Sequence, residues 1–214
     1  MTPGMTIDEL RLADEPARWA ALGFAPDSDL LTLGSVRLRL CGEAAGRGLI
    51  SWSLREADSE QLDGLPMTRS TSAVPDPAPA QPNGILAVDH IVAVTPALDR
   101  TVQRLQAAGL DLRRVREQPT PAGAPRQAFF RLGGPILEVV QEPEEAIARH
   151  GRPDRPARFW GLALIAPDLD ATLAALGEHA GDARPAVQPG RRIATIRRSA
   201  GLAVPVALIS PRPY

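Results

Sequence analysis

The chain has 214 residues, of which 44% are hydrophobic, and this content is ample for a packed core. Its formal net charge of −1 gives no overall basic field that would attract nucleic acid or an anionic membrane. All 24 basic residues are arginine, and without lysine the chain has no Schiff-base nucleophile, no pyridoxal-phosphate anchor and no P-loop lysine.

The first segment, residues 5–57, reads as a strand, a short helix and three further strands. The first strand is predicted over 7–12, and a helix follows that begins near Pro16 and ends at Gly23. The three further strands are predicted at 30–33, 35–40 and 49–54. We interpret this segment as a degenerate half-domain of β-α-β-β-β type.

Residues 58–84 are predicted to be a proline-rich linker. The run ValProAspProAlaProAlaGlnPro at 74–82 favours extended polyproline conformations and cannot pair as an interior strand. The part over 63–69 contains apolar residues that a free tether does not need. We therefore expect that part to lie against the body of the protein.

Residues 85–141 form a complete β-α-β-β-β unit. A strand over 86–95 leads into a helix whose apolar residues recur at i, i+4 and i+7 from Leu98, and Gly109 ends this helix. The remaining strands are predicted at 110–116, 126–132 and 135–141, with Gly133-Gly134 as the turn between the last two.

Residues 158–212 repeat this unit. The phrase ValAspHisIleValAlaValThrProAlaLeuAsp at 88–99 is matched without a gap by PheTrpGlyLeuAlaLeuIleAlaProAspLeuAsp at 159–170. The repeat predicts a strand at 159–165, a helix at 168–179 and strands at 192–198 and 203–210. In the match, Gly161 stands where the first copy has His90.

Two consecutive units of this kind, with AspHis at 89–90 in a first strand and LeuGluValVal at 137–140 in a fourth, resemble the vicinal oxygen chelate superfamily. That superfamily includes glyoxalase I, extradiol dioxygenases, methylmalonyl-CoA epimerase and the bleomycin resistance proteins. The resemblance covers one whole domain, residues 85–212. It implies an α+β fold in which repeated β-α-β-β-β units form a curled mixed sheet around a cavity, with residues 5–57 as an additional degenerate unit.

The resemblance also implies a divalent metal, held in the cavity by side chains of the first and fourth strands. His90 and Glu138 would then be catalytic and would ligate zinc, iron, manganese, nickel or cobalt. The second copy has Gly161 at the position of His90 and Leu208 at that of Glu138, so half of the usual ligand set is missing. Glu9, at the His90 position of the degenerate unit, is the third candidate ligand.

Residue types alone leave two other arrangements open. A histidine on an apolar strand can be a hydrogen-bonded core residue, and a carboxylate there needs a partner: a metal, His90, or an arginine such as Arg126 or Arg131. Alternatively, His90 and Glu138 form a pair without metal, because a carboxylate orients an imidazole and raises its basicity for proton abstraction.

Three further side chains are candidates for ligand binding. Arg126 and Arg192 precede the third strands of their units, and the planar guanidinium fork favours carboxylate and phosphate groups. Trp160 begins the first strand of the second unit and is expected to line the pocket. The alternative for the arginines is a role as edge charges that keep exposed strands from pairing with other molecules.

The functional expectation is a glyoxalase-like protein that acts on a small anionic or oxygen-rich molecule by lyase, isomerase or dioxygenase chemistry. The alternative is a small-molecule-binding protein without catalysis, like the antibiotic-sequestering members of the superfamily. The extra unit leaves a homodimer open, because it can offer a sheet edge to a second subunit. Since no run approaches roughly 18 apolar residues, no membrane partner is expected, and the chain is placed in the cytoplasm.

Overall fold

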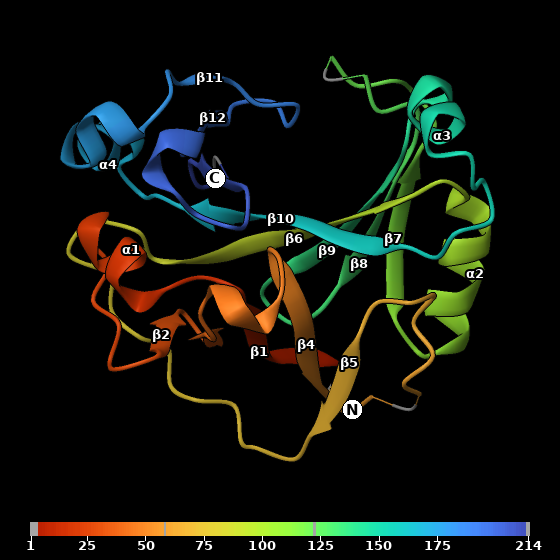
Figure 1. The fold of residues 1–214 in the computed structure, drawn as a ribbon, viewed down its shortest axis with the longest axis horizontal. Helices are drawn as coiled ribbons and strands as arrows, with labels where there is room; N and C mark the ends of the chain where they lie inside the picture. The colour runs from red at the N-terminus through yellow and green to blue at the C-terminus, as the bar shows by residue number, and fades with distance from the viewer. Residues whose placement is uncertain (1–3, 58, 122, 213–214) are drawn as a thin grey trace.

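The computed structural model of the chain describes residues 4–57, 59–121 and 123–212 and contains two mixed β-sheets. Asp58, the first residue of the predicted linker, lies outside the described residues. The smaller sheet has five strands in the order β2-β3-β1-β4-β5, and the larger has eight in the order β11-β12-β13-β10-β6-β9-β8-β7. Figure 1 shows the smaller sheet in the lower half of the molecule, below β6 and β10 of the larger one.

The strands of the five-stranded sheet are β1 (Thr6–Leu12), β2 (Leu30–Leu33), β3 (Val36–Leu40), β4 (Leu49–Arg55) and β5 (Met67–Ser70). The strands of the eight-stranded sheet are β6 (Ala87–Thr95), β7 (Asp111–Arg116), β8 (Gln127–Arg131), β9 (Ile136–Gln141), β10 (Arg158–Ile165), β11 (Arg184–Pro185), β12 (Arg192–Thr195) and β13 (Val206–Ile209). The helices are α1 (Pro16–Ala21), α2 (Leu98–Ala107), α3 (Glu144–His150) and α4 (Leu169–Leu176).

The eight-stranded sheet consists of the two predicted units. In the first unit β6 pairs in parallel with β9, and in the second β10 pairs in parallel with β13. The units join where β6 and β10 run antiparallel, and there His90 faces Ala163 while Val92 faces Gly161. These two pairs are related by the 71-residue offset of the repeat, so the units meet about a local twofold axis. The α+β fold with repeated β-α-β-β-β units is confirmed.

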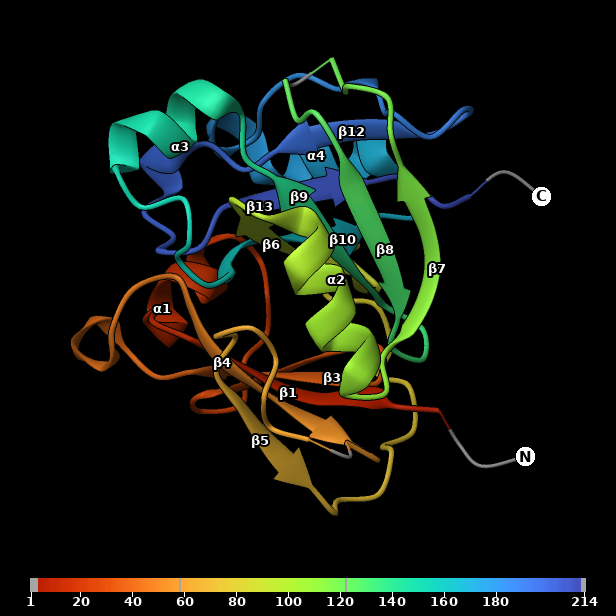
Figure 2. The same ribbon diagram turned by 90° about the vertical axis from the view of Figure 1, so that its right-hand side faces the viewer.

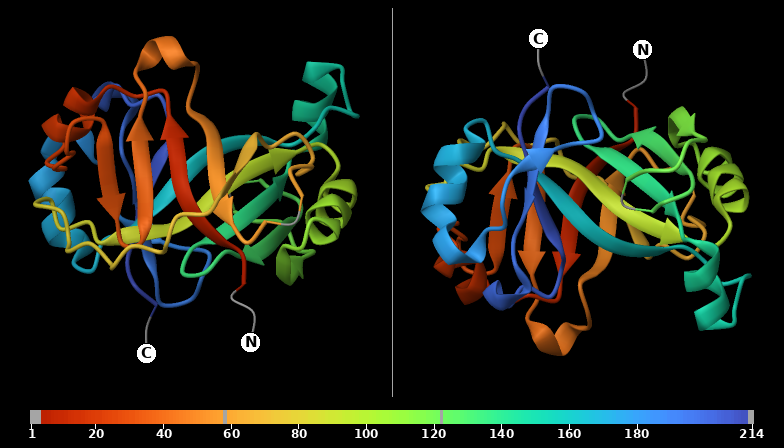
Figure 3. Two further views of the ribbon diagram at one scale, coloured as in Figure 1. Left: turned by 90° about the horizontal axis from the view of Figure 1, so that it is seen from below. Right: turned by 90° about the horizontal axis from the view of Figure 1, so that it is seen from above.

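The five-stranded sheet differs from the predicted degenerate unit in the role of β4. We expected 49–54 to be the last strand of that unit. Instead, β4 runs antiparallel to β1, as β10 does to β6, and β5 runs parallel to β4, as β13 does to β10. Because β1 also pairs in parallel with β3, the small sheet repeats the central strand arrangement of the large one with fewer strands. Figure 3 shows it face-on in its left panel.

Two segments outside the predicted β-α-β-β-β units contain regular structure. Residues 142–158 hold helix α3, with Pro143 at its N-cap, two glutamates in its first turn and the left-handed Gly151 at its end. The predicted linker supplies the edge strand β5. Its residue Asp63 is anchored to α2, because the buried carboxylate accepts hydrogen bonds from Thr101 at 2.5 Å and from Arg104 at 3.0 Å. This part of the linker therefore lies against the body, as expected.

The hydrophobic core lies between the two sheets. On β9 the buried residues Leu137 and Val139 alternate with half-buried ones, and they pack with Ile91 of β6 into one core together with residues of the small sheet. Trp52 of β4 makes an edge contact with Phe159 of β10, with ring centroids 5.2 Å apart. Helix α2 belongs to the first unit and lies on the outer side of its strands (Figure 2). Among the described residues, none of the helices is long and apolar enough to cross a bilayer.

The other face of the eight-stranded sheet carries His90, Val92 and Glu138, and we call it the open face. It points away from the five-stranded sheet. Figure 1 shows β12 above β10 on one side of this face, and β7 crossing the level of β6 and β10 on the other side. The sheet is therefore curled, with its concave side carrying the residues that the sequence analysis singled out.

Candidate functional site

A β-bulge in β6 positions the centre of the site. The register between β6 and β10 passes from His90 opposite Ala163 to Val88 opposite Leu164, so Asp89 is the extra residue. A bulge re-aims a side chain that would otherwise point to the far face of the sheet. As a result, the Asp89 carboxylate lies beside its neighbour, with Oδ2 2.7 Å from Nδ1 of His90.

Glu138 faces the second nitrogen of the imidazole. It lies on β9 opposite Val92, and its Oε2 is 3.3 Å from Nε2 of His90. Its other oxygen, Oε1, accepts a hydrogen bond from the side-chain amide of Gln127 on β8. The amide oxygen of Gln127 is buried and has no hydrogen-bond partner among the described residues. The site is thus a row of four side chains, Asp89, His90, Glu138 and Gln127, of which the sequence analysis assigned roles only to His90 and Glu138.

Asp89 is fixed in its charged form by a buried arginine. Arg191, whose side chain is 2% exposed, donates to Asp89 Oδ1 at 2.6 Å and to the carbonyl oxygen of Ser210 at 2.7 Å. Burial disfavours the charged carboxylate, but the hydrogen bonds from His90 and Arg191 outweigh this effect and lower the pKa of Asp89 to about 2. The negative charge of Asp89 is therefore present at neutral pH and holds the Nδ1 proton of His90.

Glu138 has the opposite behaviour. Burial raises the pKa of Glu138 above its usual range, and the nearby His90 and the hydrogen bond from Gln127 offset this only in part. The 3.3 Å contact between Nε2 of His90 and Oε2 of Glu138 places the two groups where a proton can pass from one to the other. A carboxyl group with a raised pKa in contact with an imidazole can take up and release a proton at one position.

The structure does not bring together the three expected metal ligands. Glu9 lies on β1 of the other sheet, where its carboxylate accepts from Arg39 at 3.1 Å. Both ring nitrogens of His90 face carboxylates. Within residues 4–57, 59–121 and 123–212, no three His, Cys, Asp or Glu side chains form a group that could hold a metal ion. The donor set therefore does not fit the metal that the superfamily resemblance implies.

Over residues 158–212, the second unit supplies no further metal ligand. The predicted match of Leu208 to Glu138 was wrong by one residue. Glu138 is opposite Val92, so its equivalent is the residue opposite Ala163, which is Ala207. Leu208 is fully buried in the core instead. At Gly161, an added Cβ atom would lie 2.8 Å from the carbonyl oxygen of Pro205, so no larger side chain fits there without a backbone shift.

The two arginines expected to bind ligand are both held in ion pairs. Arg126 contacts Asp99 at 3.0 Å and Glu117 at 2.6 Å, and Arg192 contacts Asp170 at 2.8 Å. Since Asp99 and Asp170 are equivalent in the repeat, each unit has a guanidinium that joins its third-strand region to the first turn of its helix. These contacts give both arginines a structural function.

Trp160, the third candidate for ligand binding, is the extra residue of a second bulge, in β10. Its side chain is 51% exposed, whereas its neighbour Phe159 packs in the core against Trp52. On the matching hairpin, Phe130 is fully buried and Phe129 is half-buried. Trp160 is thus exposed, but it is not among the residues that line the pocket beside Asp89, and of the two phenylalanines only Phe130 belongs to the core.

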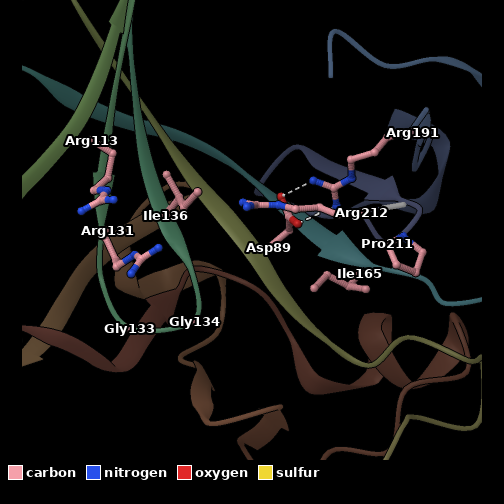
Figure 4. A pocket seen from close by; sticks show the side chains of 10 residues that line it. All are labelled: Asp89, Arg113, Arg131, Gly133, Gly134, Ile136, Ile165, Arg191, Pro211 and Arg212. Carbon is pink, nitrogen blue, oxygen red and sulfur yellow. Dashed lines mark hydrogen bonds and ion pairs between the residues drawn. The ribbon is translucent and has the colours of Figure 1, made fainter. Parts of the chain in front are cut away.

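A pocket of about 560 Å³ opens next to the His90 row (Figure 4). It begins at Asp89 and at Ile136, which is paired with His90 across β6 and β9. Its lining includes four arginines: Arg113, Arg131, Arg191 and Arg212. The sequence analysis named Arg131 only as a possible partner of the Glu138 carboxylate, and the sequence alone does not indicate which of the 24 arginines the curled sheet brings together.

Comparison with known proteins supports the fold. No protein-family model and no curated protein matches this sequence. Among solved structures, methylmalonyl-CoA epimerase from Mycobacterium tuberculosis aligns with a TM-score of 0.51 and 19% identity, over 64% of this chain and 93% of its own. A xylose isomerase-like TIM barrel/4-hydroxyphenylpyruvate dioxygenase fusion protein aligns with a TM-score of 0.60 and 14% identity, over 98% of this chain and half of its own. With two β-α-β-β-β units joined in one curled sheet, the chain has the fold of the vicinal oxygen chelate superfamily.

Proposed function

We propose that this protein catalyses proton transfer on a small anionic or oxygen-rich molecule bound at the open face, as an isomerase or lyase, with His90 and Glu138 as the acid–base pair. The observation that carries the proposal is the contact of a buried Glu138 with Nε2 of a histidine whose Nδ1 faces Asp89. An unpaired carboxyl group buried on an apolar strand is unfavourable, so its partner has to compensate for the burial.

The proposed reaction begins with removal of a proton from a carbon next to a carbonyl group. The base is the His90–Glu138 pair, and the C–H bonding electrons pass to the carbonyl as an enolate forms. Asp89 stabilises the imidazolium that results and keeps the ring in one orientation. In a hydroxyketone, return of the proton on the same face to the neighbouring carbon, with a hydroxyl proton passing to the carbonyl oxygen, gives an isomer, and loss of a β-substituent from the enolate gives a lyase product. Each outcome balances without a further reactant.

Solvent isotope exchange tests this proposal without knowledge of the substrate. A panel of 2-oxo acids, hydroxyketone phosphates and acyl thioesters is incubated with the protein in D₂O, and loss of each α-proton signal is followed by NMR. We expect enzyme-dependent exchange for at least one compound, and we expect His90→Gln and Glu138→Gln each to slow it by roughly 10²–10⁴-fold. Exchange that survives in both variants at the wild-type rate would contradict the assignment of the pair.

A second candidate function, ligand binding without catalysis, is favoured by the apolar part of the open face. The second unit contributes Gly161, Ala163 and Ala207 there, none of which can donate or accept a proton, and Trp160 is exposed nearby. Flat organic molecules bind such surfaces. In thermal-shift measurements, bulky aromatic ligands would stabilise a non-catalytic binder equally well in the wild type and in the His90→Gln variant, and no α-proton would exchange.

A further inference from the structure

The pocket beside Asp89 has an excess of positive charge. Its lining contains four arginines and one acidic residue, Asp89. The remaining lining is small or apolar, with Ile136, Ile165 and Pro211 among it. A guanidinium group is more weakly hydrated than an ammonium group and presents its N–H donors in a fixed, planar arrangement. A cluster of guanidinium groups around a pocket therefore suits the binding of an oxyanion.

Two of the four guanidiniums already have carboxylate partners. Arg191 is paired with Asp89 at 2.6 Å, and Arg113 lies 3.3 Å from Asp111. Arg131 and Arg212 make no ion pair and no side-chain hydrogen bond within the described part of the chain. The pocket therefore holds two positive charges that nothing in the described chain neutralises.

These two side chains approach the pocket from different elements. Arg131 ends β8 of the first unit, and Arg212 follows β13 of the second. Figure 4 shows Arg131 on one side of the pocket and Arg212 on the other. A ligand between them would bridge the two units at the end of the sheet nearest to His90.

The turn between β8 and β9 leaves room for such a ligand. Gly133 and Gly134 line the pocket, and Gly133 has a φ of +78°, which a residue with a side chain rarely adopts. A Cβ added at Gly134 would meet nothing within 4 Å. The backbone amides of both glycines donate no hydrogen bond within the described residues, and successive free amides of this kind bind anions.

We infer that this pocket binds a doubly charged oxyanion group, a phosphate monoester or a pair of carboxylates, through Arg131 and Arg212. Two unpartnered unit charges match a dianion, whereas a monoanion would leave one of them uncompensated. Asp89 joins this pocket to the acid–base pair, because its Oδ1 contacts Arg191 and its Oδ2 contacts His90. That the dianion belongs to the molecule whose proton is moved rests on the proposed function, whereas anion binding itself does not.

Isothermal titration calorimetry at low ionic strength tests the inference. The probes are inorganic phosphate, malonate and, as a monoanion, acetate, with sodium chloride of equal ionic strength as the reference. The variants are Arg131→Gln and Arg212→Gln, and Arg149→Gln on the exposed side of α3 is the charge-matched control. We expect phosphate or malonate to bind more tightly than acetate, and each pocket variant to weaken this binding about tenfold or more, because a charge-assisted hydrogen bond is lost. The control should stay within about twofold.

Each outcome decides the question. Binding of phosphate alone or of malonate alone supports the site and identifies the kind of oxyanion. No binding of either dianion to the wild-type protein, or equal binding to the wild type and both variants, overturns it. Both side chains are exposed, so folding should not change, and Arg131→Lys is expected to retain part of the affinity since it keeps the charge and loses the fork. Proton exchange without dianion binding would overturn only this inference, and dianion binding without exchange would overturn only the proposed function.

Discussion

The two sheets share one backbone feature, a β-bulge in the first strand, but differ in the side chains around it. In each sheet the first strand has a β-bulge at an aspartate, Asp8 in β1 and Asp89 in β6, where the strand meets its antiparallel neighbour. Each aspartate pairs with a buried arginine: Arg55 contacts Asp8, and Arg191 contacts Asp89. The next residue differs, since Glu9 follows Asp8 and His90 follows Asp89.

A second difference accompanies it, because Arg39 lies opposite Arg11 in the small sheet whereas Glu138 lies opposite Val92 in the large one. Glu9 is neutralised by Arg39, and Asp8 also contacts Arg37 and Ser70, so both of these carboxylates in the small sheet have their charge matched. His90 instead lies between two carboxylates. In both sheets the bulge thus places a carboxylate against a buried arginine, and the residue after it determines whether that carboxylate lies beside a second carboxylate or beside the imidazole that we propose as the base.

The largest effect is expected when the buried arginine of each sheet is removed, and it tests whether the two bulges differ in function. Arg191→Met should lower the free energy of unfolding by about 3 kcal/mol, because it leaves the buried Asp89 carboxylate without its arginine. Arg55→Met should cost less, because Arg37 still forms an ion pair with Asp8. Urea denaturation followed by circular dichroism measures this effect. Only Arg191→Met should also slow α-proton exchange, since only Asp89 contacts His90.

The matched control is Arg149→Met, whose exposed side chain should change the stability by less than about 0.5 kcal/mol. A loss of under about 1 kcal/mol for Arg191→Met would show that Asp89 does not depend on its arginine. Slower exchange in Arg55→Met, at full folding, would show that the two bulges are not functionally distinct.

A smaller effect is expected from the charge of Asp89 itself. Its pKa is lowered from 3.8 to about 2, so the folded state binds this proton less readily than the unfolded state. The resulting stabilisation is fully present above pH 3.8 and is lost as the pH falls through about 2. It amounts to about 2 kcal/mol.

The measurement is the difference in unfolding free energy between wild type and Asp89→Asn at a series of pH values from about 5 to about 2. We expect this difference to shrink by about 2 kcal/mol across that range, because the wild-type protein loses a contribution that the variant lacks. A difference that stays constant with pH would mean that Asp89 is not held in its charged form by His90 and Arg191.

Much of the fold followed from the sequence, because periodicity and turn residues act locally. The predicted strand over 126–132 is observed as Gln127–Arg131, and the helix that Gly109 was expected to end finishes at Ala107. Helix α3 was overlooked although its signals were present, with Pro143 before it and Gly151 after it.

The site was less predictable, because it depends on register and on distant contacts. Leu208 was matched to Glu138 by aligning Pro205 with Pro135, but the hairpins differ in length, and pairing across the sheet assigns Ala207. The bulge that turns Asp89 toward His90 comes from the pairing of β6 with β10 and has no signal in the sequence of β6 alone.

The smallest expected effect concerns the second unit, whose site cannot be restored by one substitution. Gly161→Ala should lower the free energy of unfolding by about 1–2 kcal/mol, because the new Cβ would lie 2.8 Å from the carbonyl oxygen of Pro205, which already accepts a hydrogen bond from the backbone amide of Leu162. Gly134→Ala is the matched control: its Cβ meets nothing within 4 Å, and the change should stay within about 0.5 kcal/mol. If Gly161→Ala were as harmless as the control in urea denaturation, the contact between β10 and β13 could relax. Gly161→His would then be able to supply a second imidazole to the open face, and the asymmetry between the units would be a matter of side chains alone. If the loss is seen, the asymmetry is built into the backbone, and proton transfer at His90 has to proceed from one unit.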